Sequence, residues 1–390
     1  MGITNKGDKP EKGNNITKHI VLYIIETIVL VLVVVGAIFI RKATKVEKVN
    51  LNEENIETNE MSAVDESTST PYPSADKKDS AMPSKEEEVD KEKISKELYE
   101  KYNGKFNIAF FGVDSRDGEL GAGTRSDSMI ICCIDMETHE VKLVSIYRDT
   151  YLNIGNDTYN KCNAAYAKGG PERALSMINI NTDLYIDQYI TVGFEGLVDA
   201  IDALGGVPID VKEDEIFHLN NYQLSMAEAL GKEYIPVVVP GTQMLNGVQA
   251  TAYCRIRYAK GSDFKRAERQ RDVITAMLKR TKTVSLSSLT AAVTAIFPNV
   301  QTSLSINDVI SMMSVAADYE VTLSDGFPFE GMRNGANISS CGNCVVPTSL
   351  TKNVKKLHEL LFDETDYEPS DAVKKYSAII EENTNGLLMY

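Results

Sequence analysis

The stretch FNIAFFGV at residues 106–113 decides how the folded part of this chain is organised. Its apolar residues follow one another almost without interruption and Asp114 ends them, which is typical of a buried strand. Residues 129–134 and 141–147 have the same character, and residues 136–139 lie between them as a turn. We therefore expect these three stretches to be strands of a central sheet.

Helical segments alternate with shorter strands over the rest of the chain. Gly169 and Gly170 precede one predicted helix, Gly205 and Gly206 end another, and Ser262 is expected to cap a third. The predicted helices cover residues 171–178, 194–204, 263–280, 285–295 and 306–317, and further strands cover 207–211 and 250–258. Strands and helices mixed at this density predict an α/β fold of the α/β/α type, with a central mixed sheet flanked by helices.

The N-terminal region contains one strongly apolar segment. Residues 20–40 are interrupted only by Glu26, and at 1.5 Å per residue they would span about 30 Å, the thickness of a bilayer core. The run is longer than that of a signal peptide and has no small-residue cleavage site, so we expect an uncleaved transmembrane helix, a signal-anchor. Lysines and arginines flank it on both sides, so the positive-inside rule sets no orientation. The polar residues 41–103 are expected to form a flexible stem.

Composition narrows the classes of function. The 390-residue chain carries a formal net charge of -15, which argues against general nucleic-acid binding because neutralising phosphates needs clustered cations. A Walker-type glycine-rich loop, a G-x-S-x-G nucleophile elbow and an H-E-x-x-H zinc motif are missing from the sequence. The six cysteines are too sparse for a disulfide scaffold. The spacing of Cys341 and Cys344 leaves open a local disulfide or free thiols, whereas zinc would need two further ligands.

A basic segment at residues 253–271 (YCRIRYAKGSDFKRAERQR) stands out in this acidic chain. On the predicted strand, Arg255 and Arg257 are two residues apart and point to one face, while Cys254 and Ile256 face the core. Two guanidinium groups on one strand face, close to the start of the next helix, suit a phosphate or pyrophosphate. The segment therefore predicts an anion site.

The helix that follows contributes a second set of polar side chains. Arg266, Arg269 and Gln270 are spaced three and four residues apart, so they form one stripe on its surface. A strand that ends and a helix that begins within a few residues can direct both sets at one point. The alternative, a solvated charged helix with internal salt bridges, is the interpretation for Lys265 and Arg271.

An acidic cluster lies earlier in the chain. Asp114 falls just after a predicted strand and Asp127 just before the next, so the two carboxylates can share a hard divalent cation that prefers oxygen ligands. Arg125 beside them could hold a carboxylate or a phosphate, and Arg148 ends the following strand at the same edge. Taken alone, aspartates in such loops are as often turn formers. Weaker candidates for polar contacts are Lys161 and Asn163.

In this order, these motifs resemble the LytR-CpsA-Psr family. The similarity runs from residue 106 to 280 and more loosely to 362, behind an N-terminal membrane helix. Each motif alone is unspecific, but the ordered set is very specific, and mild departures at Cys162 and Cys254 remove no polar group. The matching motifs are GVDSR at 112–116, RSDSM at 125–129, YRD at 147–149, KCNAAY at 161–166, LGGVPIDV at 204–211 and RIR followed by SDFKRAERQ within 255–270.

The resemblance implies an enzyme that transfers a phosphate-linked glycopolymer (teichoic acid, capsule or similar) from a polyprenyl pyrophosphate lipid to a muramic acid hydroxyl of peptidoglycan. It implies that Asp114 and Asp127 hold Mg²⁺ (or Mn²⁺). The implied pyrophosphate ligands are Arg125, Arg148, Arg255, Arg257, Arg266 and Gln270. The implied catalytic residues are Asp114, Arg125, Arg148, Arg257 and Asp263, with no residue assigned as the base.

The resemblance also implies a single-pass membrane protein of a Gram-positive type of envelope, with its N-terminus in the cytoplasm. The expected organisation is a short cytoplasmic tail at 1–19, the anchor at 20–40, the stem at 41–103, an extracytoplasmic domain at 104–366 with its core at 106–280, and a C-terminal tail at 367–390. The same site could serve a polyprenyl-pyrophosphate phosphatase or pyrophosphatase, or a non-catalytic lipid-binding module. A transcriptional attenuator is disfavoured by the acidic chain and its membrane helix.

Overall fold

The computed structural model describes residues 94–95, 99, 104–115, 119–257 and 262–389. The expected N-terminal tail, the apolar segment at 20–40 and nearly all of the stem therefore lie outside the described residues. Within the described part of the chain, none of the helices is long and apolar enough to cross a bilayer.

A mixed sheet forms the centre of the described structure, with strands in the order β10-β3-β2-β1-β6-β9. β1 pairs antiparallel with β2 and parallel with β6, and β2 pairs antiparallel with β3. The predictions of three apolar strands and of a central mixed sheet are confirmed. The strands are β1 (Lys105–Val113), β2 (Ser126–Asp135), β3 (Glu140–Ile146), β6 (Gln188–Val192), β9 (Val300–Thr302) and β10 (Glu320–Phe327).

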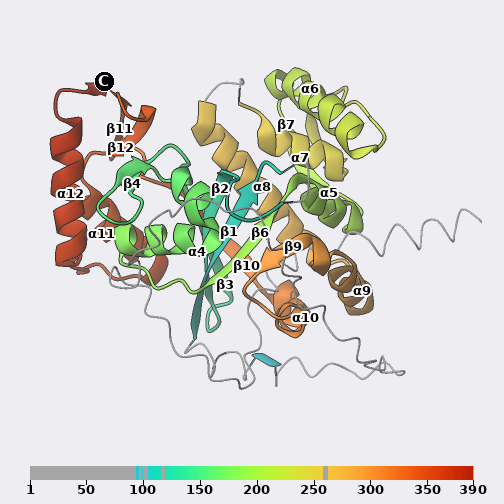
Figure 1. Ribbon diagram of the computed structural model, residues 1–390. Coiled ribbons are helices and arrows are strands. Elements are labelled where there is room, and N and C mark those ends of the chain that lie inside the picture. Colours follow the sequence, from blue (N-terminus) through green and yellow to red (C-terminus); the bar gives the residue numbers. More distant parts are fainter. Residues whose placement is uncertain (1–93, 96–98, 100–103, 116–118, 258–261, 390) are drawn as a thin grey trace, which may run out of the picture.

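Helices cover both faces of this sheet (Figure 1). The predicted helices near 171–178, 194–204, 263–280, 285–295 and 306–317 are confirmed, as is the strand at 207–211. The helices are α4 (Asn163–Thr182), α5 (Phe194–Ala203), α6 (Glu213–Leu230), α7 (Gly247–Arg255), α8 (Ser262–Thr281), α9 (Leu286–Ile296), α10 (Ile306–Val315), α11 (Leu350–Phe362) and α12 (Asp371–Thr384).

Shorter strands form three small sheets around this centre. They are β4 (Tyr151–Asn153) with β5 (Tyr159–Lys161), β7 (Val207–Val211) with β8 (Gly241–Leu245), and β11 (Arg333–Ile338) between β12 (Gly342–Pro347) and β13 (Leu388–Met389). β12 also meets the chain after β3, through a parallel bridge between Thr150 and Val345. The β11–β12 hairpin therefore lies beside the end of a central strand.

The strands are apolar on both faces because each face has its own core. Along β1, Ile108 and Phe110 pack with residues of α5, α7, α8, α9 and α10. Their neighbours Ala109 and Phe111 pack with residues of α4, α11 and α12 on the other face. Burying one such large side chain contributes about 1.5–3 kcal/mol. Because both faces are buried, apolar and polar residues hardly alternate along the strand sequence.

The predicted strand at 250–258 is wrong, because residues 247–255 form helix α7. Asn246 caps the helix: its side chain accepts from the Gln249 N–H, and the Gln249 side chain accepts from the Asn246 N–H, both at 2.9 Å. This capping box fixes a helix start that outweighs the strand-like alternation of the following residues. Gly247 lets α7 approach α5, since a Cβ there would lie 2.1 Å from the carbonyl oxygen of Val198.

The C-terminal residues are also more structured than expected. Residues 367–390 were expected to be a tail, yet they contain helix α12, where Val373, Tyr376 and Ile380 are buried in the core on the α4 side of the sheet. β13 follows and pairs with β11. In the same half of the fold, α4 begins at Asn163, ahead of the predicted start, and contains a kink at Gly169 and Gly170.

Candidate functional site

A cavity of about 220 Å³ opens where β1 ends and β2 begins, beneath α5, α7 and α8. Most of its wall is apolar, with Phe110, Ile130, Ile190, Leu197 and Ile274 among its lining residues. One end is strongly polar. The polar and charged lining residues at that end include Asp114, Asp127, Arg255, Arg257, Arg266 and Gln270. The structure thus brings six of the predicted site residues to one cavity.

Asp127 is the centre of the polar end. Its Oδ1 lies 2.5 Å from Nη1 of Arg148, and its Oδ2 lies 2.9 Å from Nη2 of Arg257. Arg266 donates a longer hydrogen bond of 3.5 Å to the backbone oxygen of the same residue. Burial alone would raise the pKa of Asp127, but Arg148, Arg266 and Arg257 outweigh it and hold that pKa below its usual value. The carboxylate is therefore charged and is shared by the guanidinium groups of Arg148 and Arg257, while Arg266 contacts the backbone of the same residue.

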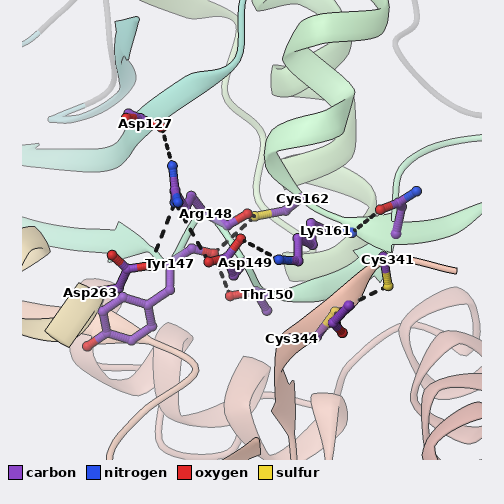
Figure 2. Close-up of polar contacts among 12 residues, drawn as sticks. Asp127, Tyr147, Arg148, Asp149, Thr150, Lys161, Cys162, Asp263, Cys341 and Cys344 are labelled. Carbon is purple, nitrogen blue, oxygen red and sulfur yellow. Dashed lines mark hydrogen bonds and ion pairs between the residues drawn. The ribbon is translucent and has the colours of Figure 1, made fainter. Parts of the chain in front are cut away.

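Asp263 joins this network from the first turn of α8. Its Oδ1 lies 3.3 Å from Nη1 of Arg266, and its Oδ2 lies 3.7 Å from Nε of Arg148. Figure 2 shows Arg148 between Asp127 and Asp263. A small second cavity of about 20 Å³ adjoins the first and shares Asp127, Arg266 and Gln270 with it. Asp263 and Arg148 line this second cavity.

Several guanidinium nitrogens of this network are buried without a hydrogen bond. Nε of Arg148, and Nε and Nη1 of Arg266, find no hydrogen-bond partner among the described residues. Arg266 is only 4% exposed, and this burial, despite nearby Asp263, lowers its pKa to about 10. Unmade hydrogen bonds of buried charged donors are costly. Guanidinium donors of this kind are able to bind the acceptor oxygens of an anion.

Arg255 enters the cavity differently from the prediction. It is the last residue of α7, and its guanidinium stacks on the rings of Phe194 and Tyr222, at 4.3 and 5.4 Å from their centroids. Arg257 comes two residues later, in the segment between α7 and α8. The two arginines thus meet at one cavity as expected, although no strand places them there. Cys254 and Ile256 are buried, as expected.

Three residues of the basic segment lie outside the wall of the cavity. Arg269 is buried against Glu215 of α6, with 2.7 Å between Nε and Oε1, and is not part of the predicted stripe in the cavity wall. Arg271 is also buried, where its guanidinium donates to the hydroxyls of Ser145 and Ser324, so the prediction of a solvated side chain is wrong. Lys265 is paired at the surface with Glu268 at 2.8 Å, as expected.

Arg125 is a predicted ligand that the structure brings into neither cavity. Its side chain is exposed and is not among the cavity's lining residues. The weaker candidate Lys161 forms an ion pair of 3.1 Å with Asp149, next to Arg148 (Figure 2). The backbone N–H of Asn163 donates to the backbone oxygen of Arg148 at 3.2 Å. Both weaker candidates therefore support the chain around Arg148.

The sequence analysis missed the roles of the aromatic residues around the site. Tyr222 comes from α6, a helix that was not predicted. Phe264 and Tyr147 meet edge to face at 4.6 Å, and Arg333 of β11 stacks over them at 4.1 and 5.0 Å from the ring centroids. This stack ties the first turn of α8, and hence Asp263, to the C-terminal part of the fold.

The chemistry of Asp114 and Asp127 fits a hard divalent cation. Both carboxylates line the same cavity, and Mg²⁺ is commonly held by one or two carboxylates together with phosphate oxygens and water. Among the described residues, no group of three or more histidine, cysteine, aspartate or glutamate side chains is arranged to hold a metal without such a partner. Both oxygens of Asp127 already contact arginines, so a cation would have to share this carboxylate with them.

Known proteins show the same fold. Biofilm regulatory protein A of Streptococcus mutans is 32% identical over 213 residues, which are 52% of this chain and 50% of that protein. The polyisoprenyl-teichoic acid–peptidoglycan teichoic acid transferase TagV of Bacillus subtilis is 28% identical over 288 residues, 72% of this chain and 69% of that protein. The crystal structure of TagV superposes with a TM-score of 0.53 at 26% identity, covering 68% of this chain and 98% of that one.

The match thus spans about half the length of the first relative and about two thirds of the second. The sequence model of the LytR_cpsA_psr family matches residues 68–337, which is more than half of the chain. This match confirms the resemblance seen in the ordered motifs, and the central sheet with its arginine-lined cavity lies within the matched range. The chain belongs to the LytR_cpsA_psr family.

Proposed function

We propose that this protein transfers a phosphate-linked glycopolymer (teichoic acid, capsule or similar) from a polyprenyl pyrophosphate lipid to peptidoglycan. The observation that supports it most is the set of buried guanidinium N–H groups of Arg148 and Arg266 that have no hydrogen-bond partner among the described residues. A pyrophosphate offers charged acceptor oxygens to several such donors at once. The relative TagV carries the name of this reaction.

The cavity suits both ends of such a donor. An apolar wall continues from the charged end, so a prenyl chain and its pyrophosphate would each meet matching surroundings. Arg255, held flat against Phe194 and Tyr222, and Arg257 would take phosphate oxygens from the α7 side. Arg266 and Gln270 would do so from α8. Arg125 would have to move inward to become a ligand.

The reaction asks mainly for positioning and charge neutralisation. The hydroxyl oxygen of the acceptor sugar forms a bond to the phosphorus that carries the polymer, the bond from this phosphorus to the bridging oxygen breaks, and prenyl phosphate leaves. The hydroxyl loses its proton, and no residue is assigned as its acceptor. Arg148, Arg257 and Arg266 would stabilise the negative charge that builds up on the leaving phosphate, with Asp127 and Asp263 holding them in place.

We also propose that Asp114 and Asp127 bind Mg²⁺ (or Mn²⁺), which would neutralise phosphate charge. Residues 20–40 would anchor the chain in the membrane with the N-terminus in the cytoplasm, so that the folded domain reaches a lipid-borne donor outside. The acidic net charge and the membrane anchor give no support to nucleic-acid binding.

The test uses the full chain in detergent with a labelled lipid-linked glycopolymer and peptidoglycan oligomers. We expect label to appear on the oligomers, to fall strongly in Arg266→Gln, and to persist in Lys265→Gln. The control is matched because Lys265 precedes Arg266 on α8 and pairs with Glu268 at the surface. Release of the polymer into water without attachment would support the pyrophosphatase instead. Lipid binding without either reaction would support a lipid-binding module.

A further inference from the structure

Outside the cavity, a second reactive cluster lies at the tip of the β11–β12 hairpin. Cys341 is half-buried in the turn and Cys344 is buried in β12, with 3.2 Å between their Sγ atoms (Figure 2). We infer that Cys341 and Cys344 are the substrate pair of a disulfide oxidant outside the membrane, and that their disulfide fastens this hairpin beneath the Arg148–Asp149 segment. The inference uses the proposed extracytoplasmic position but not the proposed transfer reaction.

The backbone presents the two thiols to each other. Ile338 of β11 pairs with Gly342 of β12, and the Cys341 N–H donates to the Ile338 oxygen at 3.0 Å, so the turn between the strands is tight. Gly342 has a φ of 75°, a left-handed conformation that glycine adopts without strain. A disulfide is about 2 Å long, so small rotations of the two side chains would bring the sulfurs to bonding distance.

The other four cysteines lie in different surroundings. Cys132 and Cys133 are neighbours on β2 and pack into opposite faces of the sheet. The Cys162 thiol donates to the backbone oxygens of Tyr147 and Arg148, at 3.1 and 3.3 Å. Cys254 is buried in α7. These four thiols are buried, whereas Cys341 is open enough for an oxidant to reach.

Zinc explains this cluster less well than a disulfide. A structural zinc site needs four ligands from cysteine, histidine or carboxylate side chains. Within the described ranges no group of three such residues is arranged around a metal position, so the two thiols would lack protein partners for a zinc ion. Two cysteines at contact distance, with one of them partly exposed, fit a disulfide without any further ligand.

The hairpin is coupled to the site through the backbone. The residue after Cys344 is Val345, whose N–H donates to the backbone oxygen of Asp149 at 2.9 Å. Asp149 in turn lies between Lys161, at 3.1 Å, and Nε of Arg148, at 3.7 Å. A bond from Cys341 to Cys344 would therefore restrain the strand that supports the residue next to the Arg148 guanidinium.

The oxidation is an ordinary thiol–disulfide exchange. The Cys341 thiolate attacks a disulfide of an oxidising protein or small molecule and forms a mixed disulfide, with release of one thiol. The Cys344 sulfur then attacks the Cys341 sulfur and displaces the second thiol. The two cysteines lose two electrons and two protons, which the oxidant's disulfide takes up as it becomes two thiols. Burial, with a contribution from Cys341, raises the pKa of Cys344 to about 12, which agrees with Cys341 reacting first.

The test counts thiols in the full chain after exposure to oxidised glutathione. Denaturation and alkylation should then label four of the six cysteines, and peptide mapping should find Cys341 joined to Cys344. After treatment with dithiothreitol all six should be labelled. Six labelled thiols after oxidation, or glutathione attached to Cys341 without an internal bond, would overturn the inference. Neither result depends on whether the protein transfers glycopolymer.

A second measurement tests the coupling. For a closed loop this short, the chain-entropy model gives at most roughly a twentyfold change in the unfolding equilibrium. Dithiothreitol should therefore speed hydrogen exchange at the Val345 amide by up to that factor in the wild type. The Cys341→Ser variant should exchange at the reduced wild-type rate with or without dithiothreitol. If this amide exchanges equally fast in oxidised and reduced wild-type protein, the bond does not fasten the hairpin.

Discussion

Arg148, just after the end of β3, forms an ion pair with Asp127 at the start of β2, with 2.5 Å between the guanidinium Nη1 and the carboxylate Oδ1. Arg257 takes the other oxygen of the same carboxylate at 2.9 Å. These strands are central and buried on both faces, so the pair sits on a rigid base. A single carboxylate thus holds several cations together in advance of an anionic ligand, which is the preorganisation that phosphoryl transfer requires.

The Asp127→Asn variant should be less stable than the wild type, but an added anion should stabilise it more than it stabilises the wild type. Its amide would leave Arg148, Arg257 and Arg266 without their shared counter-charge. Breaking a buried ion pair costs about 3–5 kcal/mol. The Asp127 side chain is 25% exposed, so we expect a smaller loss of about 1–3 kcal/mol in the free energy of unfolding.

Denaturant titration measures this loss, and thermal unfolding with inorganic pyrophosphate measures the gain. Pyrophosphate should raise the melting temperature of the variant more than that of the wild type, because the carboxylate no longer competes for the arginines. An equal or smaller rise in the variant would show that Asp127 does not compete with the anion for these guanidinium groups.

The same carboxylate predicts a dependence of stability on pH. The arginines hold the folded-state pKa of Asp127 below its ordinary value of 3.8, so the folded protein binds a proton there less readily than the unfolded chain. The stabilisation is therefore complete above pH 3.8 and is lost as the pH falls below it toward the folded-state pKa. Urea titrations at several pH values should show that the free energy of unfolding falls more steeply with acid in the wild type than in Asp127→Asn. Parallel acid profiles for the two proteins would contradict the prediction.

The central strands and most helices could be predicted because their signals are local. Apolar runs such as 106–113 and glycine pairs such as Gly205-Gly206 depend on no distant partner. The prediction for residues 250–258 was wrong because their alternating pattern fits a strand as well as a helix. Only the reciprocal contacts of Asn246 and Gln249 decide for a helix. Short apolar stretches carry this ambiguity whenever a capping motif goes unnoticed.

The members of the site were harder to separate from their neighbours. Arg266, Arg269 and Arg271 look alike in sequence, yet their roles depend on partners that come from other elements. Glu215, more than fifty residues earlier, neutralises Arg269 in the core, while serines of β3 and β10 receive Arg271. Nε and Nη1 of Arg266 make no hydrogen bond among the described residues, and its one carboxylate partner, at 3.3 Å, is Asp263 of the same helix. Helical spacing alone carries no information on these distant contacts.

The Arg266→Gln variant should lose ligand binding without losing stability. Folding buries the Arg266 charge, and this burial lowers its pKa to about 10. A neutral side chain therefore removes the free-energy cost of burying that charge. We expect a free energy of unfolding within about 1 kcal/mol of the wild type, or above it. A charged hydrogen bond contributes about 1.5–3 kcal/mol, so the affinity for prenyl pyrophosphate should fall roughly ten- to a hundredfold.

Calorimetry with a short-chain prenyl pyrophosphate checks the affinity, and denaturant titration checks the stability. Arg269→Gln is the contrasting variant, because it leaves the carboxylate of Glu215 buried and unpaired. It should be strongly destabilised, by about 3–5 kcal/mol. If Arg266→Gln were the less stable of the two, Arg266 would be a structural residue and not one that binds a ligand.

The stacking of Arg255 predicts that charge alone is not sufficient at that position. Arg255→Lys keeps the positive charge but loses the planar group that lies on Phe194 and Tyr222. We expect about fivefold weaker binding of prenyl pyrophosphate, from the loss of about 1 kcal/mol of stacking and fork geometry. Tyr222→Phe retains the ring face and should bind as the wild type does. Equal binding by Arg255→Lys and the wild type would show that the stack contributes nothing to the site.

Removal of divalent cations provides the last prediction, and it separates the roles of the two carboxylates. Chelation with EDTA should lower transfer, and Mg²⁺ or Mn²⁺ should restore it, if Asp114 and Asp127 share a cation with the donor phosphates. Asp114→Asn should then require a higher Mg²⁺ concentration for half-maximal transfer, because one of two charged ligands is gone.

Asp127→Asn should show the same shift together with its loss of stability, since only Asp127 also holds Arg148 and Arg257. Titrating Mg²⁺ against the rate of transfer for the wild type and the two variants checks this difference. A third variant, Asp263→Asn, serves as the control, because Asp263 contacts Arg148 and Arg266 but does not line the larger cavity with Asp114. Transfer that is insensitive to EDTA, or an unchanged Mg²⁺ requirement in Asp114→Asn, would mean that the guanidinium groups neutralise the phosphates without a metal at these carboxylates.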